Sequence, residues 1–450
     1  MARHRNRRIS ALAVVCLAAL ATAGCLQDPN AGGSSGGAGG EVFADGGTAD
    51  GDGTVEILGA FGGAEQEAFE KSLTKFEDES GITIEYTAST DFTTIVKSRV
   101  QGGDTPDIAL FPQPGGLTEL AADNHIQPID TFLDYDGLDD TLIPGFFDSV
   151  RLNGRVYGAP MRMAVKSIVW VPKDEWEKRG YTLEPESIQE LEKIADEIKA
   201  DGIAPWCIGY ESDQATGWVG TDWIEEYVLR VGGPEVYDDW VEHKIPFDDP
   251  QIKKAFDAYG EISQTQGNVF GGADGILNTP FAEAMNPALQ DPPKCMMMRQ
   301  GNFAISFFSP EVQQNLDDEL SIMYFPPYDG GFGGTPVLGG GDLAALFNGN
   351  DEDAITVMEF LTSDQFGAEW AQAGGWLSPH TTFDVSNYPN DTTRRIAEIA
   401  NSADIFRFDA SDLMPKEVGS GTFWTGMVEW HRGKSTDQVT ADIESSWPTS

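Results

Sequence analysis

The sequence predicts an α/β fold in two lobes, and three observations support this prediction. Short apolar segments with the character of buried strands alternate with helical patterns along the chain. Helical crossovers between short strands imply sheets that are mostly parallel. The chain of 450 residues exceeds the usual size of one hydrophobic core, and no long linker follows residue 54. We therefore expect two lobes that are joined by several crossings.

The first globular elements follow a β-α-β-α-β order. Phe69, Leu73 and Phe76 have helical spacing, and Gly81 ends that helix. We expect strands over 54–60, 82–86 and 108–111, with helices over 69–76 and 93–100 between them. This order predicts a parallel sheet, because helical crossovers connect its strands.

The same alternation continues through the rest of the chain. Ser187 and Glu190 form a capping box ahead of an amphipathic helix that includes Leu191 and Ile198. Further helices are expected over 221–231, 253–262, 352–361 and 394–401, and strands over 167–171, 303–308, 321–325 and 343–347. No repeat of 20–50 residues is present, which disfavours a solenoid.

The N-terminus has the order of a secretory signal peptide. Basic residues come first, an apolar run covers 11–21, and small residues lead to Cys25. A Cys in that place resembles the lipobox of bacterial lipoproteins. We therefore expect a signal peptide over 1–24, lipidation of Cys25 and a flexible Gly- and Ser-rich tether over 25–53. An ordinary signal peptide with an unrelated Cys is the alternative, and export by the general or the twin-arginine route stays open.

The charge of the chain excludes one class of partner. Its 73 acidic and 29 basic residues give a net charge of −44. Nucleic-acid binding needs a basic surface, so no nucleic-acid partner is expected. The acids are spread along the chain, which indicates a solvated, self-repelling surface, with adaptation to high salt as an alternative. No calcium-loop motif or metal-ligand spacing occurs, and we expect neither a metal nor a cofactor.

Two cysteines remain in the globular part, Cys207 and Cys295. An exported protein encounters an oxidising environment, so we expect these residues to form a disulfide. Two buried free thiols are the alternative. A zinc site is disfavoured, because two Cys without paired His do not supply four ligands.

A set of short motifs resembles extracellular solute-binding proteins of family 1, the carbohydrate-capturing lipoproteins of ABC importers. The first-lobe signature lies at 102–112 (GGDTPDIALFP), and 157–161 (YGAPM) with 165–173 resembles the first crossing between lobes. The remaining motifs follow in order at 205–209, 215–218, 221–225, 339–342, 374–379, 409–415 and 423–424. Together they cover most of the globular part, and they are most similar to the α-glucoside- and maltose-binding branch.

The resemblance implies a Venus-flytrap fold of periplasmic-binding-protein type, a ligand cleft between the lobes and no catalysis. Lobe 1 would comprise 54–163 and 326–376, and lobe 2 would comprise 164–325 and 377–450. The implied function is capture of a neutral carbohydrate, a glucoside or short oligosaccharide, by hinge closure. The implied partners are the transmembrane subunits of an ABC permease. We expect a monomer on the outer face of the cytoplasmic membrane, held there only by its lipid.

Ligands of doubly wound sheets bind beyond the carboxyl ends of the strands. Glu65, Asp91 and Gln113 follow the first three predicted strands and can hydrogen-bond sugar hydroxyls. Glu65 also fits the first turn of a helix, where an acid interacts favourably with the helix dipole. Helix stabilisation is therefore the alternative for Glu65.

Sugars offer flat C–H faces, which aromatic side chains cover, ringed by hydroxyls that need polar partners. All eleven Trp lie at or after residue 170. The candidate ligand residues among and near them are Trp218, Asp222, Trp223, Asp342, Trp376, Arg407 and Trp424. Trp424 occupies a Phe-Trp pair like that of a ligand-stacking Trp in maltose-binding relatives, and Arg407 lies close to Asp409. Core packing is the alternative for each of these Trp, Trp424 included, and helix capping, a turn and a surface ion pair are the alternatives for Asp222, Asp342 and Arg407.

Two other classes of function remain open. A secreted glycoside hydrolase also places carboxylates across a sugar, but no nucleophile-elbow, zinc-protease or phosphate-loop motif is present. The other class is a receptor for a different solute, such as a polyol, glycerol phosphate or a peptide. A phosphate would require Arg or Lys in the cleft, and the predicted cleft loops contain few basic residues.

Overall fold

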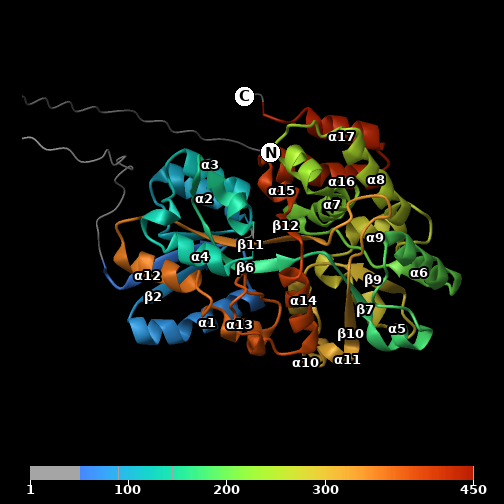
Figure 1. Cartoon of the computed structure of the whole chain (residues 1–450), viewed down its shortest axis with the longest axis horizontal. Helices are drawn as coiled ribbons and strands as arrows, with labels where there is room; N and C mark the ends of the chain where they lie inside the picture. The colour runs from blue at the N-terminus through green and yellow to red at the C-terminus, as the bar shows by residue number, and fades with distance from the viewer. Residues whose placement is uncertain (1–50, 90, 144, 449–450) are drawn as a thin grey trace, which may run out of the picture. The chain divides into compact units, whose positions relative to one another are not determined.

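The computed structural model describes residues 51–448, apart from residues 90 and 144 (Figure 1). The predicted signal peptide (1–24), Cys25 and nearly all of the predicted tether (25–53) lie outside the described residues. Within the described part, none of the helices combines the length and the apolar character that a membrane span requires.

The first sheet contains the predicted β-α-β-α-β unit. Strand β1 (Thr54–Gly59) pairs in parallel with β2 (Thr83–Ala88) and β3 (Ile108–Phe111), and helices α1 (Ala64–Ser80) and α2 (Phe92–Gly102) connect them. Gly81 ends α1 with a φ of 77°, as its position in the sequence predicts. The full order is β12-β11-β3-β1-β2, with β11 at Pro336–Leu346, β12 at Ile405–Phe408 and β6 (Ala159–Val165) pairing with β11.

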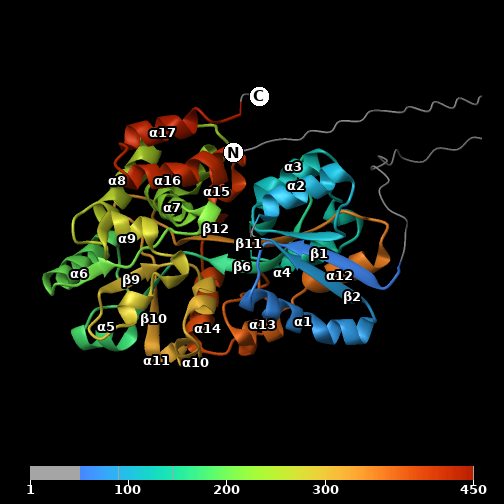
Figure 2. The ribbon, with the colours of Figure 1, turned by 180° about the vertical axis from the view of Figure 1, so that it is seen from behind.

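Helices cover both faces of this sheet. Figures 1 and 2 show α2 and α3 (Pro114–Ala122) on one side, and α1 and α13 (Ala368–Ala373) on the other. Helix α12 (Glu352–Leu361) packs against α1, because Phe76 and Phe360 stack with ring centroids 4.4 Å apart. The small β4–β5 hairpin (Arg151–Leu152, Arg155–Val156) and α4 (Tyr135–Thr141) complete this part of the chain.

The second sheet has the order β10-β7-β9-β8 and is mixed rather than mostly parallel as predicted, because two of its three strand pairs are antiparallel. Strand β7 (Ile168–Pro172) is antiparallel to β10 (Leu320–Tyr324) and β9 (Cys295–Arg299), whereas β8 (Ala204–Trp206) and β9 are parallel. Cys207 and Cys295 form the predicted disulfide and link β9 to the segment after β8. The helices of this part are α5 (Lys173–Arg179), α6 (Ile188–Ala200), α7 (Trp218–Val241), α8 (Pro250–Ser263), α9 (Gly272–Asn278), α10 (Pro310–Gln314), α11 (Leu316–Glu319), α16 (Trp424–His431) and α17 (Thr436–Glu444).

Among the described residues, two connections join strands of the two sheets directly, and a third leads from the first sheet to α15, which contacts α7. Only Lys166 and Ser167 separate β6 from β7, residues 325–335 separate β10 from β11, and β12 is followed almost at once by α15 (Ala410–Leu413). The division into the lobes 54–163 with 326–376 and 164–325 with 377–450 stays a prediction. Strand β12, which that division gives to the second lobe, pairs with β11 in the first sheet.

Most predicted elements are confirmed, with two corrections. The helix predicted over 221–231 is the first part of α7, which is interrupted at Gly233, and the helix predicted over 394–401 is α14 (Asp391–Asn401). Ser187 caps α6, but the Glu190 carboxylate accepts from the Glu186 N–H, so only half of the capping box forms. The strand predicted over 303–308 is wrong, because Asn302–Phe307 is a 3-10 helix.

Candidate functional site

A cavity of about 350 Å³ lies between elements of the two sheets. The first-sheet side contributes the loops after β1 and β3 together with β6 and β11. The other side contributes Lys166, the start of α7, the aromatic side chains of Phe281, Phe303 and Phe307, and the residues after β12. This position agrees with the rule that ligands bind beyond the carboxyl ends of strands, where chain connections change direction.

Six predicted ligand residues line this cavity: Glu65, Gln113, Trp218, Asp222, Asp342 and Trp424. They come from five different segments of the chain, since Trp218 and Asp222 share α7, and the fold brings them together. Each of the six is a candidate ligand residue.

Two predicted Trp belong to the core. Trp223 is fully buried and stacks on Tyr259 with ring centroids 5.0 Å apart. Adjacent helical residues point about 100° apart, so with Asp222 facing the cavity its neighbour Trp223 points away from it. Trp376 is 1% exposed and packs against Phe383. The alternative of core packing therefore describes both residues.

The other two predicted residues also lie away from the cavity lining. Arg407 donates from Nε and Nη2 to the Asp238 carboxylate over 2.7 and 2.8 Å, the ion pair named as its alternative. Asp91 is exposed and immediately precedes α2. Position after a predicted strand selected Asp91, but that rule does not fix the direction of the side chain.

One ion cluster belongs to the first sheet. Arg162 on β6 lies opposite Asp342 on β11 and donates to it from Nε, while Nη1 is 2.7 Å from Glu65 Oε1. The Arg162 guanidinium also lies 4.8 Å from the ring centroid of Phe61. Burial raises the pKa of Asp342, and the charge of Arg162 opposes that rise. We call these three charged residues the sheet cluster.

A second ion cluster lies at the connection between β6 and β7. The Lys166 ammonium is 3.0 Å from Asp222 Oδ1, donates to Asp409, and lies 5.0 Å from the Trp218 ring centroid. Burial raises the pKa of Asp222 to about 7 and also raises the pKa of Asp409. Burial alone lowers the pKa of Lys166, but the two carboxylates raise it above its usual value. We call Lys166, Asp222 and Asp409 the crossing cluster.

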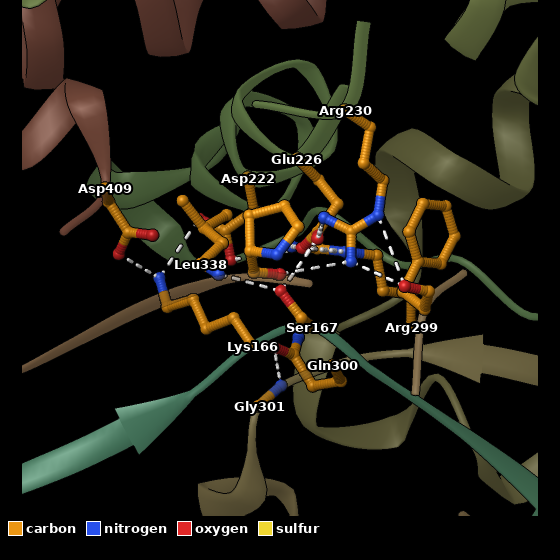
Figure 3. A network of polar contacts seen from close by, with 12 residues as sticks. Lys166, Ser167, Asp222, Glu226, Arg230, Arg299, Gln300, Gly301, Leu338 and Asp409 are labelled. Atoms are coloured by element: carbon orange, nitrogen blue, oxygen red, sulfur yellow. Dashed lines mark hydrogen bonds and ion pairs between the residues drawn. The ribbon is translucent and has the colours of Figure 1, made fainter. Parts of the chain in front are cut away.

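Charged residues of α7 extend the crossing cluster into a buried network (Figure 3). Ser167 donates to Glu226 over 2.7 Å and accepts from the Leu338 N–H of β11 over 2.8 Å. Arg299 donates to Glu226 over 3.1 Å. Arg230 pairs with Glu226 and donates to the Pro326 carbonyl over 2.8 Å.

This network attaches α7 to all three connections between the sheets. Residues 222, 226 and 230 recur at intervals of four, which places them along one face of the helix. The Glu225 carboxylate from the same helix accepts from the Ser411 N–H over 2.9 Å, beyond β12. Helix α7 therefore holds together the segments that connect the two sheets.

Aromatic side chains form another part of the cavity wall. Trp218 and Phe281 have ring centroids 5.2 Å apart, and Phe281 in turn contacts Phe307. Gly217, with a φ of 119°, lies so close to Trp424 that a Cβ would be 2.1 Å from the Trp424 carbonyl oxygen. This glycine therefore allows Trp218 and Trp424 to approach the same cavity.

Asp222, Glu225 and Asp409 can each offer one carboxylate oxygen within 4.8 Å of the others, a spacing that a cation can bridge. The Lys166 ammonium already contacts two of these carboxylates. The acids therefore have a positively charged partner from the chain itself.

Sequence reasoning missed several cavity residues. Arg162, Lys166, Phe281, Phe303, Phe307 and Asp412 line the cavity without having been predicted. Arg162 lies between two of the motifs quoted for the family resemblance, at 157–161 and 165–173, and Lys166 lies inside the second. Those motifs were the available signal for both cations.

Two α/β sheets, several connections and a polar, aromatic-lined cavity between them define the class of two-domain ligand receptors. The family model described as bacterial extracellular solute-binding protein matches residues 62–392. The chain belongs to this family of ABC-transporter solute-binding proteins.

Individual relatives agree with this assignment. The osmoprotective compounds-binding protein GgtB of Synechocystis is 40% identical over 88% of this chain and 92% of its own length. The alpha-glucosides-binding periplasmic protein AglE of Rhizobium meliloti is 34% identical over 88% of this chain and 87% of its own. A solved structure described in connection with xylan utilization by Caldanaerobius polysaccharolyticus matches with a TM-score of 0.73 at 20% identity, covering 87% of this chain and 99% of that one. The last similarity concerns the fold alone.

Proposed function

We propose that the chain is the receptor of an ABC importer for a neutral carbohydrate, a glucoside or short oligosaccharide. The observation that carries this proposal is the combination of ring faces and polar atoms around one cavity. Trp218, Phe281 and Trp424 supply aromatic surface, and Gln113 and Asp342 supply hydrogen-bonding groups. Sugars need both kinds of contact, since an unpaired polar group on either side weakens binding.

Several buried polar atoms of the cavity residues await partners. Asp342 Oδ1 has no hydrogen-bond donor, and Trp424 Nε1 has no acceptor, among the described residues. Sugar hydroxyls both donate and accept, so one ligand can satisfy carboxylates and an indole N–H together. The names of the two relatives, which bind osmoprotective compounds and alpha-glucosides, favour a glucose-containing ligand.

Capture would occur by hinge closure around the ligand, which shifts an equilibrium between open and closed forms. The closed form would then dock on the transmembrane subunits of a permease. Lipidation of Cys25 would hold the protein, as a monomer, on the outer face of the cytoplasmic membrane. In this proposal the protein has no catalytic role and leaves its ligand chemically unchanged.

A calorimetric and thermal-shift screen of the secreted chain against mono-, di- and trisaccharides tests this function. A sugar that binds should raise the melting temperature by mass action and titrate saturably. The sugar should be recovered intact after prolonged incubation, whereas release of a reducing sugar would support the hydrolase alternative. Binding of glycerol phosphate or a peptide, with no response to any sugar, would contradict the carbohydrate proposal.

A further inference from the structure

The cavity lining carries more negative than positive charge. Five acids and two bases line it: Glu65, Asp222, Asp342, Asp409 and Asp412, against Arg162 and Lys166. With all of these groups ionised, three negative charges lack a positive counterpart among the described lining residues. An excess of this kind repels anions and attracts cations.

The charged network behind the cavity does not remove this excess. Glu225 and Glu226 add two acids, and Arg230 and Arg299 add two bases. Arg299 and Arg230 both pair with Glu226. Arg299 Nη1 is 4.0 Å from Asp222 Oδ2. Its positive charge therefore mainly compensates Glu226 and only weakly compensates Asp222 in the cavity.

Free carboxylate oxygens accompany the excess charge. Asp222 Oδ2 and Asp342 Oδ1 are buried without a hydrogen-bond donor in the described part of the chain, and Asp409 is hydrogen-bonded to the carboxyls of Glu225 and Asp412, a contact that itself requires bound protons. Their residues are only 1–2% exposed, so bulk water compensates them poorly. Burial raises the pKa of Asp222 to about 7 and raises the pKa values of Asp342, Asp409 and Asp412, so bound protons relieve part of the excess. A cationic ligand would take the place of those protons.

We propose that this cavity selects sugars by charge, favouring a sugar with a protonated amine over its neutral parent and rejecting the same sugar with a carboxylate, sulfate or phosphate. An ammonium group offers three N–H donors, which suit carboxylate oxygens that lack donors. Its charge also interacts favourably with the aromatic ring of Trp424, whereas the Trp218 ring already has the Lys166 ammonium beside it. This inference rests on the proposed carbohydrate function and specifies the ligand of the same site.

The test is calorimetry of the secreted chain with matched ligands. The parent is the tightest neutral sugar of the screen, and the analogues replace one hydroxyl at a time by an amine, or one hydroxymethyl by a carboxylate. At least one amine isomer should bind about tenfold more tightly than the parent, and the carboxylate analogue about tenfold more weakly or not at all. The positional series is needed because an amine at the wrong carbon loses a hydroxyl contact.

The pH dependence separates charge selection from a chance contact. A cation competes with the protons on the cavity carboxyls, so affinity for the tightest amine isomer should rise from pH 5 to about pH 7 more steeply than affinity for the parent. Asp412→Asn should reduce the ratio of amine affinity to parent affinity. Glu67→Gln, an exposed position two residues from Glu65, should leave that ratio unchanged.

Two results would overturn the inference and leave the proposed function intact. One is a carboxylate analogue that binds as tightly as the neutral parent sugar. The other is an amine series in which no isomer binds more tightly than the parent. Failure of every sugar to bind would instead overturn the carbohydrate proposal itself, and the inference with it.

Discussion

The sheet cluster and the crossing cluster contain the same chemistry, one cation between two carboxylates, but differ in where their residues come from. Arg162, Asp342 and Glu65 all lie on or beside the first sheet. Lys166 lies between the two sheets, and its partners come from α7 and from the segment after β12. The first arrangement orients groups within one part of the fold, whereas the second ties together segments from both parts.

The two clusters also differ in how far water reaches their charged side chains. In the sheet cluster the Arg162 and Glu65 side chains are 17% and 18% exposed and only Asp342, at 3%, is deeply buried. In the crossing cluster Lys166 is 10% exposed, and both acids, Asp222 and Asp409, are deeply buried at 3% and 2%. The charges of the crossing cluster therefore depend more strongly on one another, because water can replace less of what a lost partner supplies.

The largest effect is expected from removal of the central cations. Lys166→Met leaves Asp222 and Asp409 buried without their nearest positive charge and should cost about 3–5 kcal/mol of unfolding free energy. Arg162→Met should cost less, about 1–3 kcal/mol, because it leaves only one deeply buried carboxylate, Asp342, without its cation, whereas water reaches Glu65. Urea denaturation of both variants measures the difference. Equal losses, or a larger loss for Arg162→Met, would show that the two clusters do not differ in this way.

The dependence of stability on pH should also distinguish the clusters. In the folded state burial raises the pKa of Asp222 from 3.8 to about 7, so the folded state binds a proton more tightly than the unfolded state. Its contribution to stability is complete below pH 3.8 and is lost as the pH rises through 7. The loss amounts to about 2–4 kcal/mol. Asp222→Asn should therefore flatten the fall in urea midpoint between pH 4 and pH 7.5, and an unchanged slope would contradict this assignment.

The two clusters also show how far the sequence can predict the site. Glu65 and Gln113 follow predicted strands, and the rule about carboxyl ends placed both at the cavity. Asp342 was found through the three glycines before it. Arg162 was not found, because its contact with Asp342 joins residues 180 apart through the pairing of β6 with β11. Local patterns predict the strands themselves but not which distant strands become neighbours.

Aromatic residues illustrate a different limit. Trp218, Trp223, Trp376 and Trp424 all lie in motifs of the family, yet only Trp218 and Trp424 line the cavity. Helical periodicity alone does not tell which face of α7 is turned toward the cavity, and that direction is fixed by packing of α7 on the second sheet and on α8. The fold class and most elements followed from local patterns, whereas the direction of individual side chains followed from tertiary contacts.

The smallest of these effects is expected from the aromatic side chains of the cavity. It tests whether the side of the cavity that carries the crossing cluster also supplies stacking contacts to the sugar. Trp424→Ala should weaken sugar binding by about 1–2 kcal/mol, because it removes a stacking face and an indole N–H that lacks an acceptor among the described residues. Trp376→Phe is the matched control, since Trp376 Nε1 is also without an acceptor there but belongs to the core. The control should lower the melting temperature while leaving the dissociation constant of the folded protein unchanged. Calorimetry that finds wild-type affinity in Trp424→Ala would remove Trp424 from the ligand site and leave Trp218 and Phe281 as its aromatic surface.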